Sequence, residues 1–383
     1  MSSENPVKDA AVYASPWLAR SGAVESDGPD AGVAAHYGDP VREQRQLAAG
    51  SAVVDLSHHG VIEIEGADRL SWLDSMSTQS LARLAPAESA EALILDPNGR
   101  IEHDMRVLDD GVSLWLLVEG SEAASLAAWL DRMRFMMRVE VRDRTSDFAT
   151  LGSFADAATL AGMVPIASPH GVPLVWSDPW PDVVAGGWQY AQGEHPGAEF
   201  AYREVLVERS ALAESDAPAA GVLALEALRV AAWRPRFARE VDERSIPHEL
   251  DWMRSAVHLN KGCYRGQETV AKVHNLGHPP RRLVMLHLDG SDSILPQPGD
   301  EVVLGDRAVG AVTSAVRHHE LGSIALAVVK RTLDSTATLT VQTSDGPVAA
   351  AQEVIVPASA GATVAAPRLP RLGATTRPSR PGA

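Results

Sequence analysis

The segment Lys261–Glu268 reads KGCYRGQE and holds the only cysteine of the 383 residues. Its two glycines permit backbone conformations and close approaches that other residues avoid. Lys261 and Arg265 lie two residues to either side of Cys263, so in an extended backbone they would share its face. Positive charge nearby favours the thiolate, which is the reactive form of cysteine. The pattern therefore predicts an exposed, functional thiol; the alternative is that Cys263 is a small buried hydrophobic residue.

The charge of the surrounding segment differs from that of the whole chain. The protein carries a net charge of −16, which argues against a nonspecific nucleic-acid binder. Between His258 and Arg282, however, five basic residues against Glu268 give a net charge of +4. This local excess predicts a small anionic ligand, such as a carboxylate or a phosphate. The alternative is that these cations pair with acidic side chains elsewhere on the surface.

Two further patterns contain residues that could take part in chemistry. Asp104 follows the turn Pro97–Gly99 on an expected strand, where a carboxylate could bond a heterocycle or act as a base. The alternative is an ordinary solvated strand face.

His274 and His278 have the spacing of a metal-binding pair, but Gly277 interrupts the helix that such a pair needs. With a single cysteine, no Cys-x-x-Cys site exists either, so no metal is predicted.

The elements that must position these residues alternate irregularly between strands and helices. Apolar patterns and turn signals predict strands at 52–57, 61–65, 91–96, 100–107 and 112–118, with helical spacing at 122–137 and 222–233. Regular alternation of strand and helix would indicate a parallel α/β sheet. Its absence here predicts an α+β fold.

The two ends of the chain differ from this central part. After residue 279, short strands at 282–288, 300–304, 308–313, 324–329 and 337–341 lie between turns, a spacing typical of a small β-barrel or sandwich. Residues 1–35 are rich in small and polar residues and predict a flexible arm. Residues 358–383 carry four arginines and no acid, and predict a disordered basic tail.

The chain has no sequence feature of a membrane or secreted protein. No apolar run reaches the roughly 18 residues of a transmembrane helix. The first residues lack the basic start and apolar core of a secretory signal. A lone thiol stays reduced in the cytoplasm, which is the predicted location.

These segments together resemble a known family. KGCYRGQE resembles the K-G-C-Y-x-G-Q-E signature of the YgfZ family of folate-binding proteins, which are relatives of the glycine-cleavage T-protein, a tetrahydrofolate-dependent aminomethyltransferase. Weaker matches follow the order of that superfamily over most of the chain, at 36–38, 54–58, 66–68, 99–101, 228–229 and 246–249. The octapeptide is the specific part of the resemblance.

The resemblance implies an architecture and a biological role. It implies a folate-binding body at 36–278 with two interleaved α+β modules (one of them at about 50–145) around a folate-sized channel, followed by a C-terminal β-barrel at 279–357. Composition places the flexible arm at 1–35 before this body and the tail at 358–383 after the barrel. Tetrahydrofolate or a one-carbon derivative would be the cofactor. The implied role is assembly or repair of iron–sulfur enzymes, including enzymes that modify tRNA. The partners would be folate and these client enzymes. Composition and charge predict no direct nucleic-acid or membrane contact. The sequence does not give the oligomeric state, and a monomer is favoured.

The residues that would bind folate follow from the same resemblance. Asp104 could accept hydrogen bonds from pterin N–H groups. The cations Arg229, Lys261 and Arg265 could hold the glutamate tail. Tyr264 could stack on the ring.

Three positions depart from the aminomethyltransferase pattern. Those enzymes carry two adjacent aspartates where this chain has His103 and Asp104, a glutamate at the position of Ala231, and commonly an acid at that of Cys263. Fewer carboxylates leave fewer candidate bases. The sequence therefore favours an accessory factor with Cys263 as its working residue. The alternatives are a folate-dependent aminomethyltransferase or demethylase acting on a small donor, and a non-catalytic interaction protein.

Overall fold

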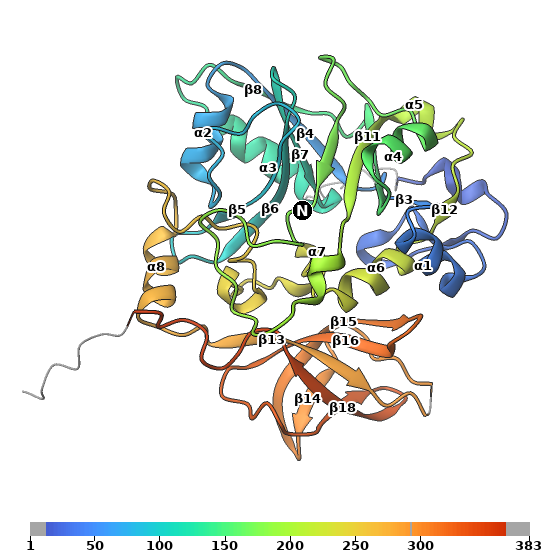
Figure 1. The fold of residues 1–383 in the computed structure, drawn as a ribbon, viewed down its shortest axis with the longest axis vertical. Helices are drawn as coiled ribbons and strands as arrows, with labels where there is room; N and C mark the ends of the chain where they lie inside the picture. Colours follow the sequence, from blue (N-terminus) through green and yellow to red (C-terminus); the bar gives the residue numbers. More distant parts are fainter. Residues whose placement is uncertain (1–12, 292, 365–383) are drawn as a thin grey trace, which may run out of the picture.

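The structure is a computed structural model that describes residues 13–291 and 293–364. Two five-stranded sheets and their helices form a body, and a closed six-stranded barrel packs beneath it (Figure 1). The predicted α+β class with a C-terminal barrel is thereby confirmed.

The first sheet has the strand order β10-β11-β9-β3-β12. Its neighbouring strands are antiparallel except for the parallel pair of β12 and β3. The strands are β3 (Val53–Asp55), β9 (Phe148–Ser153), β10 (Val175–Ser177), β11 (Arg203–Glu208) and β12 (Ala219–Ala220).

The second sheet is antiparallel throughout, in the order β5-β6-β7-β4-β8. Its strands are β4 (Gly60–Glu65), β5 (Ser89–Leu95), β6 (Ile101–Asp109), β7 (Ser113–Val118) and β8 (Glu140–Asp143). Side chains alternate between the two faces of a strand. On β6, Met105 and Val107 pack with Leu126 on the helical side, so Asp104 and Arg106 face the interior of the molecule.

The barrel closes in the order β13-β16-β15-β14-β17-β18. Its strands are β13 (Arg281–Leu288), β14 (Glu301–Leu304), β15 (Arg307–His318), β16 (Gly322–Lys330), β17 (Leu339–Thr343) and β18 (Gly346–Val354). Five of them fall where the sequence predicts strands. The sixth, β18, is rich in alanine, which has low strand propensity, so the sequence pattern did not predict this strand.

Helices cover the outer faces of the sheets and join the body to the barrel (Figure 1). They are α1 (Pro40–Ala48), α2 (Arg69–Met76), α3 (Gly120–Met133), α4 (Ala157–Met163), α5 (Arg209–Leu212), α6 (Val222–Ala231), α7 (Phe237–Glu240) and α8 (Gln267–Asn275). Short 3₁₀ helices are η1 (Pro16–Ala19), η2 (Gly28–Asp30), η3 (Pro196–Glu199) and η4 (Pro247–Leu250), and a small ribbon pairs β1 (Val24–Glu25) with β2 (Ala34–His36). None of the helices in the described ranges is long and apolar enough to cross a membrane.

Residues 13–35 differ from the predicted flexible arm, because they pack on the body. Trp17 is 1% exposed, and its indole N–H donates to the Leu212 carbonyl over 2.8 Å. Asp30 is buried among charged side chains. An aromatic anchor, Trp17, and the buried ion pairs of Asp30 help to fix this segment, and average composition does not reveal these contacts. Residues 1–12 lie outside the described part of the chain.

The start of the predicted tail is also packed. Ala360 is buried, and its carbonyl accepts from His278 over 2.7 Å. The backbone N–H of Thr363 donates to the carbonyl of His274 at the end of α8. The rest of the predicted tail, 365–383, lies outside the described residues.

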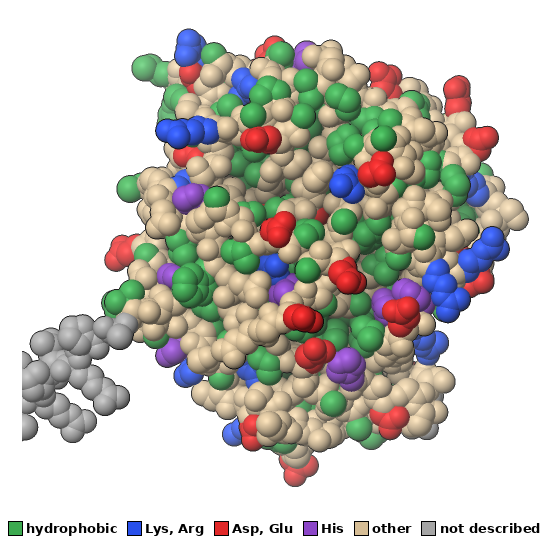
Figure 2. Space-filling view, viewed as in Figure 1, with side chains coloured by type: hydrophobic (Ala, Val, Ile, Leu, Met, Phe, Trp, Pro, Cys, Tyr) green, Lys and Arg blue, Asp and Glu red, His purple; other side chains and the backbone are tan. Residues whose placement is uncertain are grey.

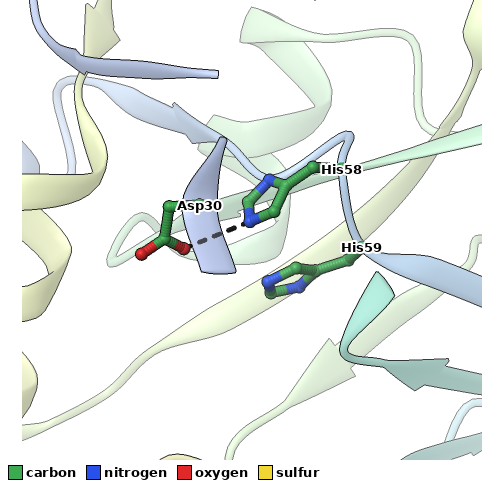
Figure 3. Close-up of side chains that lie close together, drawn as sticks. All are labelled: Asp30, His58 and His59. Carbon is green, nitrogen blue, oxygen red and sulfur yellow. Dashed lines mark hydrogen bonds and ion pairs between the residues drawn. The ribbon is translucent and has the colours of Figure 1, made fainter. Parts of the chain in front are cut away.

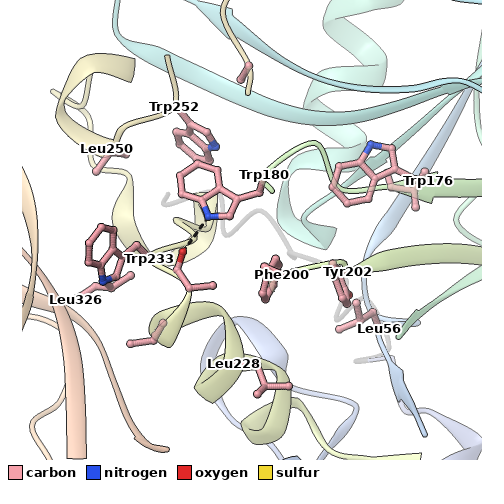
Figure 4. Packing of buried hydrophobic residues seen from close by; sticks show 14 of the residues in the cluster. Leu56, Trp176, Trp180, Phe200, Tyr202, Leu228, Trp233, Leu250, Trp252 and Leu326 are labelled. Atoms are coloured by element: carbon pink, nitrogen blue, oxygen red, sulfur yellow. Dashed lines mark hydrogen bonds between the residues drawn. The ribbon is translucent and has the colours of Figure 1, made fainter. Parts of the chain in front are cut away.

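The largest apolar cluster lies where both sheets, α6 and the barrel meet. Figure 4 shows Trp180 donating to the Ala232 carbonyl, a bond of 2.9 Å, with Phe200 and Tyr202 beside it. Leu326 of the barrel belongs to the same cluster. Body and barrel therefore share one core, and the barrel helps to position the residues around it.

Candidate functional site

A small cavity of about 40 Å³ lies at this junction, between the inner faces of the sheets and α6. Aromatic side chains line part of its wall, among them Phe200 and Tyr202. The other walls carry as many carboxylates as guanidinium groups: Asp104, Asp178, Glu204 and Glu226, and Arg106, Arg229, Arg234 and Arg236.

The four arginines are already paired with carboxylates. Arg106 lies 3.3 Å from Glu204, and Arg234 lies 2.7 Å from Glu91. Arg236 contacts Glu119 and Glu226 at 2.7 and 3.2 Å. Arg229 contacts Glu226 at 2.6 Å. The cavity is thus polar but nearly neutral, as buried charges require.

Asp104 is the exception to this pairing. It is 7% exposed, and its Oδ1 has no hydrogen-bond partner among the described residues. Burial and the nearby Glu91 carboxylate raise the pKa of Asp104 to about 8, although Arg106 and Arg234 oppose the shift. At neutral pH the group therefore holds a proton, and it can both donate and accept a hydrogen bond.

Two other carboxyl groups of the cavity wall also have raised pKa values. Burial raises the pKa of Asp178 to about 6 against the opposing charge of Arg234, and burial also raises the pKa of Glu204. Arg234 keeps one guanidinium nitrogen, Nη1, without a partner in the described part of the chain. One carboxyl oxygen and one N–H group are thus left to bind a ligand.

Next to the cavity, Asp30, His58 and His59 form a cluster whose potential metal-ligand atoms lie within 4.8 Å of one another (Figure 3). The sequence analysis did not single out this cluster. Arg236 and Arg239 lie 2.8 and 2.9 Å from the Asp30 carboxylate. Although burial opposes it, Arg236 and His58 hold the pKa of Asp30 well below its usual range. Two guanidinium groups thus already neutralise this carboxylate and would repel a metal ion.

The octapeptide loop lies at one end of the strand that carries Asp104. Arg265 pairs with Glu102 at 2.6 Å, and Glu102 precedes Asp104 by two residues on β6. Gly266 has a φ of 83°, and a Cβ there would meet the Asp96 carbonyl oxygen at 2.6 Å. This glycine is therefore required for the loop to pack against the turn that starts β6.

Lys261 and Tyr264 of this loop are packed inside the protein. The Lys261 ammonium, in a side chain 3% exposed, donates to the carbonyls of Asp74, Ser77 and Gln79. Tyr264 is buried in the core with that ammonium 5.5 Å from its ring. Because Lys261 is fully hydrogen-bonded, it fixes the end of α2 and is not free to hold a folate tail.

The structure therefore separates the predicted site residues into two groups. Asp104 and Arg229 line the cavity, but Arg229 is fully engaged and bonds Ser314 of the barrel at 2.6 Å. The other four predicted residues, Lys261, Cys263, Tyr264 and Arg265, belong to the octapeptide loop and are not among the lining residues. Cys263 is exposed, as predicted.

Several cavity residues escaped the sequence analysis. Arg106 and Glu204 stand within apolar strand segments, and Arg234 and Arg236 directly follow an apolar helix. A charged residue inside such a segment is the available signal, because a charge is buried only when it is paired. His103, in contrast, points to the other face of β6, where it contacts Glu122 at 2.5 Å.

Comparison with known proteins agrees with this architecture. The GCVT N-terminal domain matches residues 15–153, and the glycine cleavage T-protein C-terminal barrel domain matches residues 281–357. The chain therefore has the fold class of a mixed α and β body with a C-terminal barrel. More particularly, it carries GcvT-family, aminomethyltransferase-like domains.

Individual relatives are distant. The chain is 28% identical over 274 residues to a chloroplastic protein of Arabidopsis thaliana named as a candidate transferase, an alignment that covers 69% of this chain and 62% of that protein. It is 27% identical over 300 residues to an aminomethyltransferase of Symbiobacterium thermophilum, covering 73% of this chain and 78% of that one. The crystal structure of the glycine cleavage system aminomethyltransferase T from Bartonella henselae superposes with a TM-score of 0.69 at 17% identity, over 91% of this chain and 98% of that one.

Proposed function

We propose that the protein binds tetrahydrofolate in the central cavity and transfers a one-carbon unit between it and an aminomethyl-type donor. One observation carries the proposal. In the cavity, the Oδ1 of Asp104 and the Nη1 of Arg234 have no partner among the described residues, while every other charged group of the wall is paired. A bicyclic ring with N–H and C=O groups on one edge would satisfy both.

The cavity residues fit such a ligand. Phe200 and Tyr202 offer aromatic surface for stacking. At about 40 Å³ the cavity is smaller than this ligand, so binding requires the side chains of its wall to move apart. The names of the relatives, aminomethyltransferase and transferase, support transfer chemistry better than the accessory role that the sequence favours.

The chemistry assigned to this chain is proton handling. Bound folate would supply two N–H nitrogens that take the methylene carbon: two C–N bonds would form as the two bonds from that carbon to the donor break, and the two protons would go to the donor's two leaving groups, without net oxidation. Asp104 holds a proton at neutral pH in a water-poor cavity, so it can deliver the proton to the leaving group. The paired arginines keep the cavity neutral and Asp104 in place.

Isothermal titration with reduced tetrahydrofolate tests the proposal. We expect binding with a dissociation constant on the order of 1–100 µM, and much weaker binding of p-aminobenzoylglutamate, which lacks the pterin ring. The absence of binding heat, or equal affinity for the two compounds, would contradict the assignment of the pterin ring to this cavity.

A second candidate function is supported by Cys263. This thiol is exposed in the YgfZ-like octapeptide, and Arg265 joins the loop to the strand that carries Asp104. We therefore retain the proposal that the protein supports assembly or repair of iron–sulfur enzymes, including tRNA-modifying ones, through Cys263.

Replacing Cys263 by serine separates the two functions. If the thiol supports client enzymes, cells that carry Cys263→Ser should lose iron–sulfur enzyme activity, while tetrahydrofolate binds the purified variant as it binds the wild type. The matched control is Ser291→Ala, which changes an exposed hydroxyl away from the cavity. Unchanged cluster-enzyme activity in the Cys263→Ser cells would remove this second function and leave one-carbon transfer untouched.

A further inference from the structure

A second, open hollow lies outside the central cavity, where η3 and the end of α6 meet the barrel strands β13 and β18. We call it the acidic groove. It has a volume of about 750 Å³. Three carboxylates line it, those of Glu194, Glu199 and Glu353, and its lining includes no lysine or arginine. Figure 2 shows acidic and histidine side chains gathered on this face near the junction of body and barrel.

Trp233 forms one wall of the acidic groove. It is 5% exposed, and its indole N–H has no hydrogen-bond partner among the described residues. Its backbone has a φ of 58°, the left-handed conformation in which many helices end, here just after α6. The ring of His195 packs edge-on against it at 5.1 Å, and His195 is itself fixed by the N–H of Gly197.

The acidic groove offers groups that bind a cation beside a group that binds a hydrogen-bond acceptor. Its carboxylates attract a cation, and the indole face adds cation–π attraction. The unpartnered indole N–H needs an acceptor, because a buried donor without a partner is costly. Met285 and Leu321 supply apolar contact. A purely anionic ligand would be repelled by the glutamates, and a neutral apolar one would leave the N–H unsatisfied.

The acidic groove lies near the central cavity but is separated from it. Pro196, Glu199 and Ala231 form the wall between the groove and an adjoining hollow of about 380 Å³. Phe200 lies between that hollow and the central cavity. A molecule held in the groove is therefore separated from the cavity of Asp104 by these two walls.

We propose that the acidic groove binds a small amine zwitterion, with its ammonium group toward the glutamates and its carboxylate toward the Trp233 N–H. The role of this ligand rests on the proposed function: it is the amine that enters or leaves one-carbon transfer. The binding itself is independent of that function, since its residues differ from the charged groups that would bind folate.

Glycine betaine and 3,3-dimethylbutyrate test the proposal by ligand-observed NMR. The two compounds have nearly the same shape and the same carboxylate, but only betaine carries a positive charge. We expect betaine to bind at least about fivefold more tightly than dimethylbutyrate, because each rim charge contributes only modestly. Equal affinities, or no binding of either compound, would overturn the proposal.

Variants locate the binding. In Glu199→Gln/Glu353→Gln, betaine binding should weaken by about fivefold or more, to the level of dimethylbutyrate. Trp233→Phe keeps an aromatic ring but removes the N–H, and should weaken both compounds. Glu301→Gln, an exposed glutamate of the same barrel outside the groove, is the matched control and should bind betaine as the wild type does. If the double variant also binds as the wild type does, the proposal is wrong.

Titration of the same samples with tetrahydrofolate separates the two proposals. If folate fails to bind while betaine binding depends on the glutamates, the proposed function is wrong and the amine site stands. If folate binds but betaine does not, the amine site is wrong and the folate site stands.

Discussion

Asp104→Asn is expected to lower folate-dependent turnover by about 100-fold or more, the usual contribution of a positioned general acid or base. Asparagine has the same shape and can still hydrogen-bond a ligand, but it holds no transferable proton. Folate affinity should therefore change much less than turnover. The measurement is single-turnover formation of methylene-tetrahydrofolate with an aminomethyl donor.

The same substitution has a pH-dependent effect on stability whose sign follows from the raised pKa. Because the pKa of Asp104 is about 8 in the folded protein and near 3.8 when unfolded, the folded state binds more protons between these values. The contribution of Asp104 is complete below the unfolded pKa and is lost as the pH rises through about 8. Relative to wild type, Asp104→Asn should therefore be more stable at pH 9 than at pH 6, by about 1–3 kcal/mol.

His103→Asn is the matched control, because His103 is the neighbouring residue on the opposite face of β6. It should leave turnover close to that of the wild type. Wild-type turnover should fall above about pH 8, where Asp104 loses its proton. Turnover that is equal in Asp104→Asn and wild type would show that Asp104 does not take part in the chemistry.

The fold could be predicted from the sequence because its signals are local. Apolar alternation and turns such as Asp109–Gly111 mark the hairpins, and strands of the barrel follow one another at short intervals. The sequence indicates where β6 runs and that Asp104 lies on it. The sequence does not indicate which face of β6 points toward the interior of the molecule, because apolar clusters cover both faces of the second sheet.

The candidate site was predicted less completely, because it is assembled over long distances. Arg236 meets Asp30 across 206 positions of the chain, and Arg265 meets Glu102 across 163. Lys261 and Arg265 were expected to act on a ligand because their charges appeared unmatched in the local sequence. Their partners come from distant segments, and charge counts within one window cannot identify them.

Arg236→Met is expected to destabilise the protein by about 3–5 kcal/mol, the cost of removing a cation that three buried carboxylates share. Arg236 lies 2.8 Å from Asp30, 2.7 Å from Glu119 and 3.2 Å from Glu226, and all three carboxylates are buried. Methionine matches the length of the side chain but supplies no charge. The measurement is urea denaturation at pH 7, with Arg244→Met, whose side chain is 68% exposed, as a control that should stay near the wild-type value.

The pH dependence of the loss distinguishes charge from packing. Against the opposing effect of burial, Arg236 holds the pKa of Asp30 and of Glu119 below their usual ranges, so its stabilisation is present above the unfolded pKa and disappears as the pH falls. The difference between Arg236→Met and wild type should therefore persist between pH 7 and pH 5 and shrink as the pH is lowered below about 4. Arg236→Lys keeps the charge and should recover part of the stability, which covers the case in which Arg236→Met fails to fold. A difference that stays constant with pH, or a lysine variant no better than methionine, would mean that Arg236 acts by filling space rather than by neutralising these carboxylates.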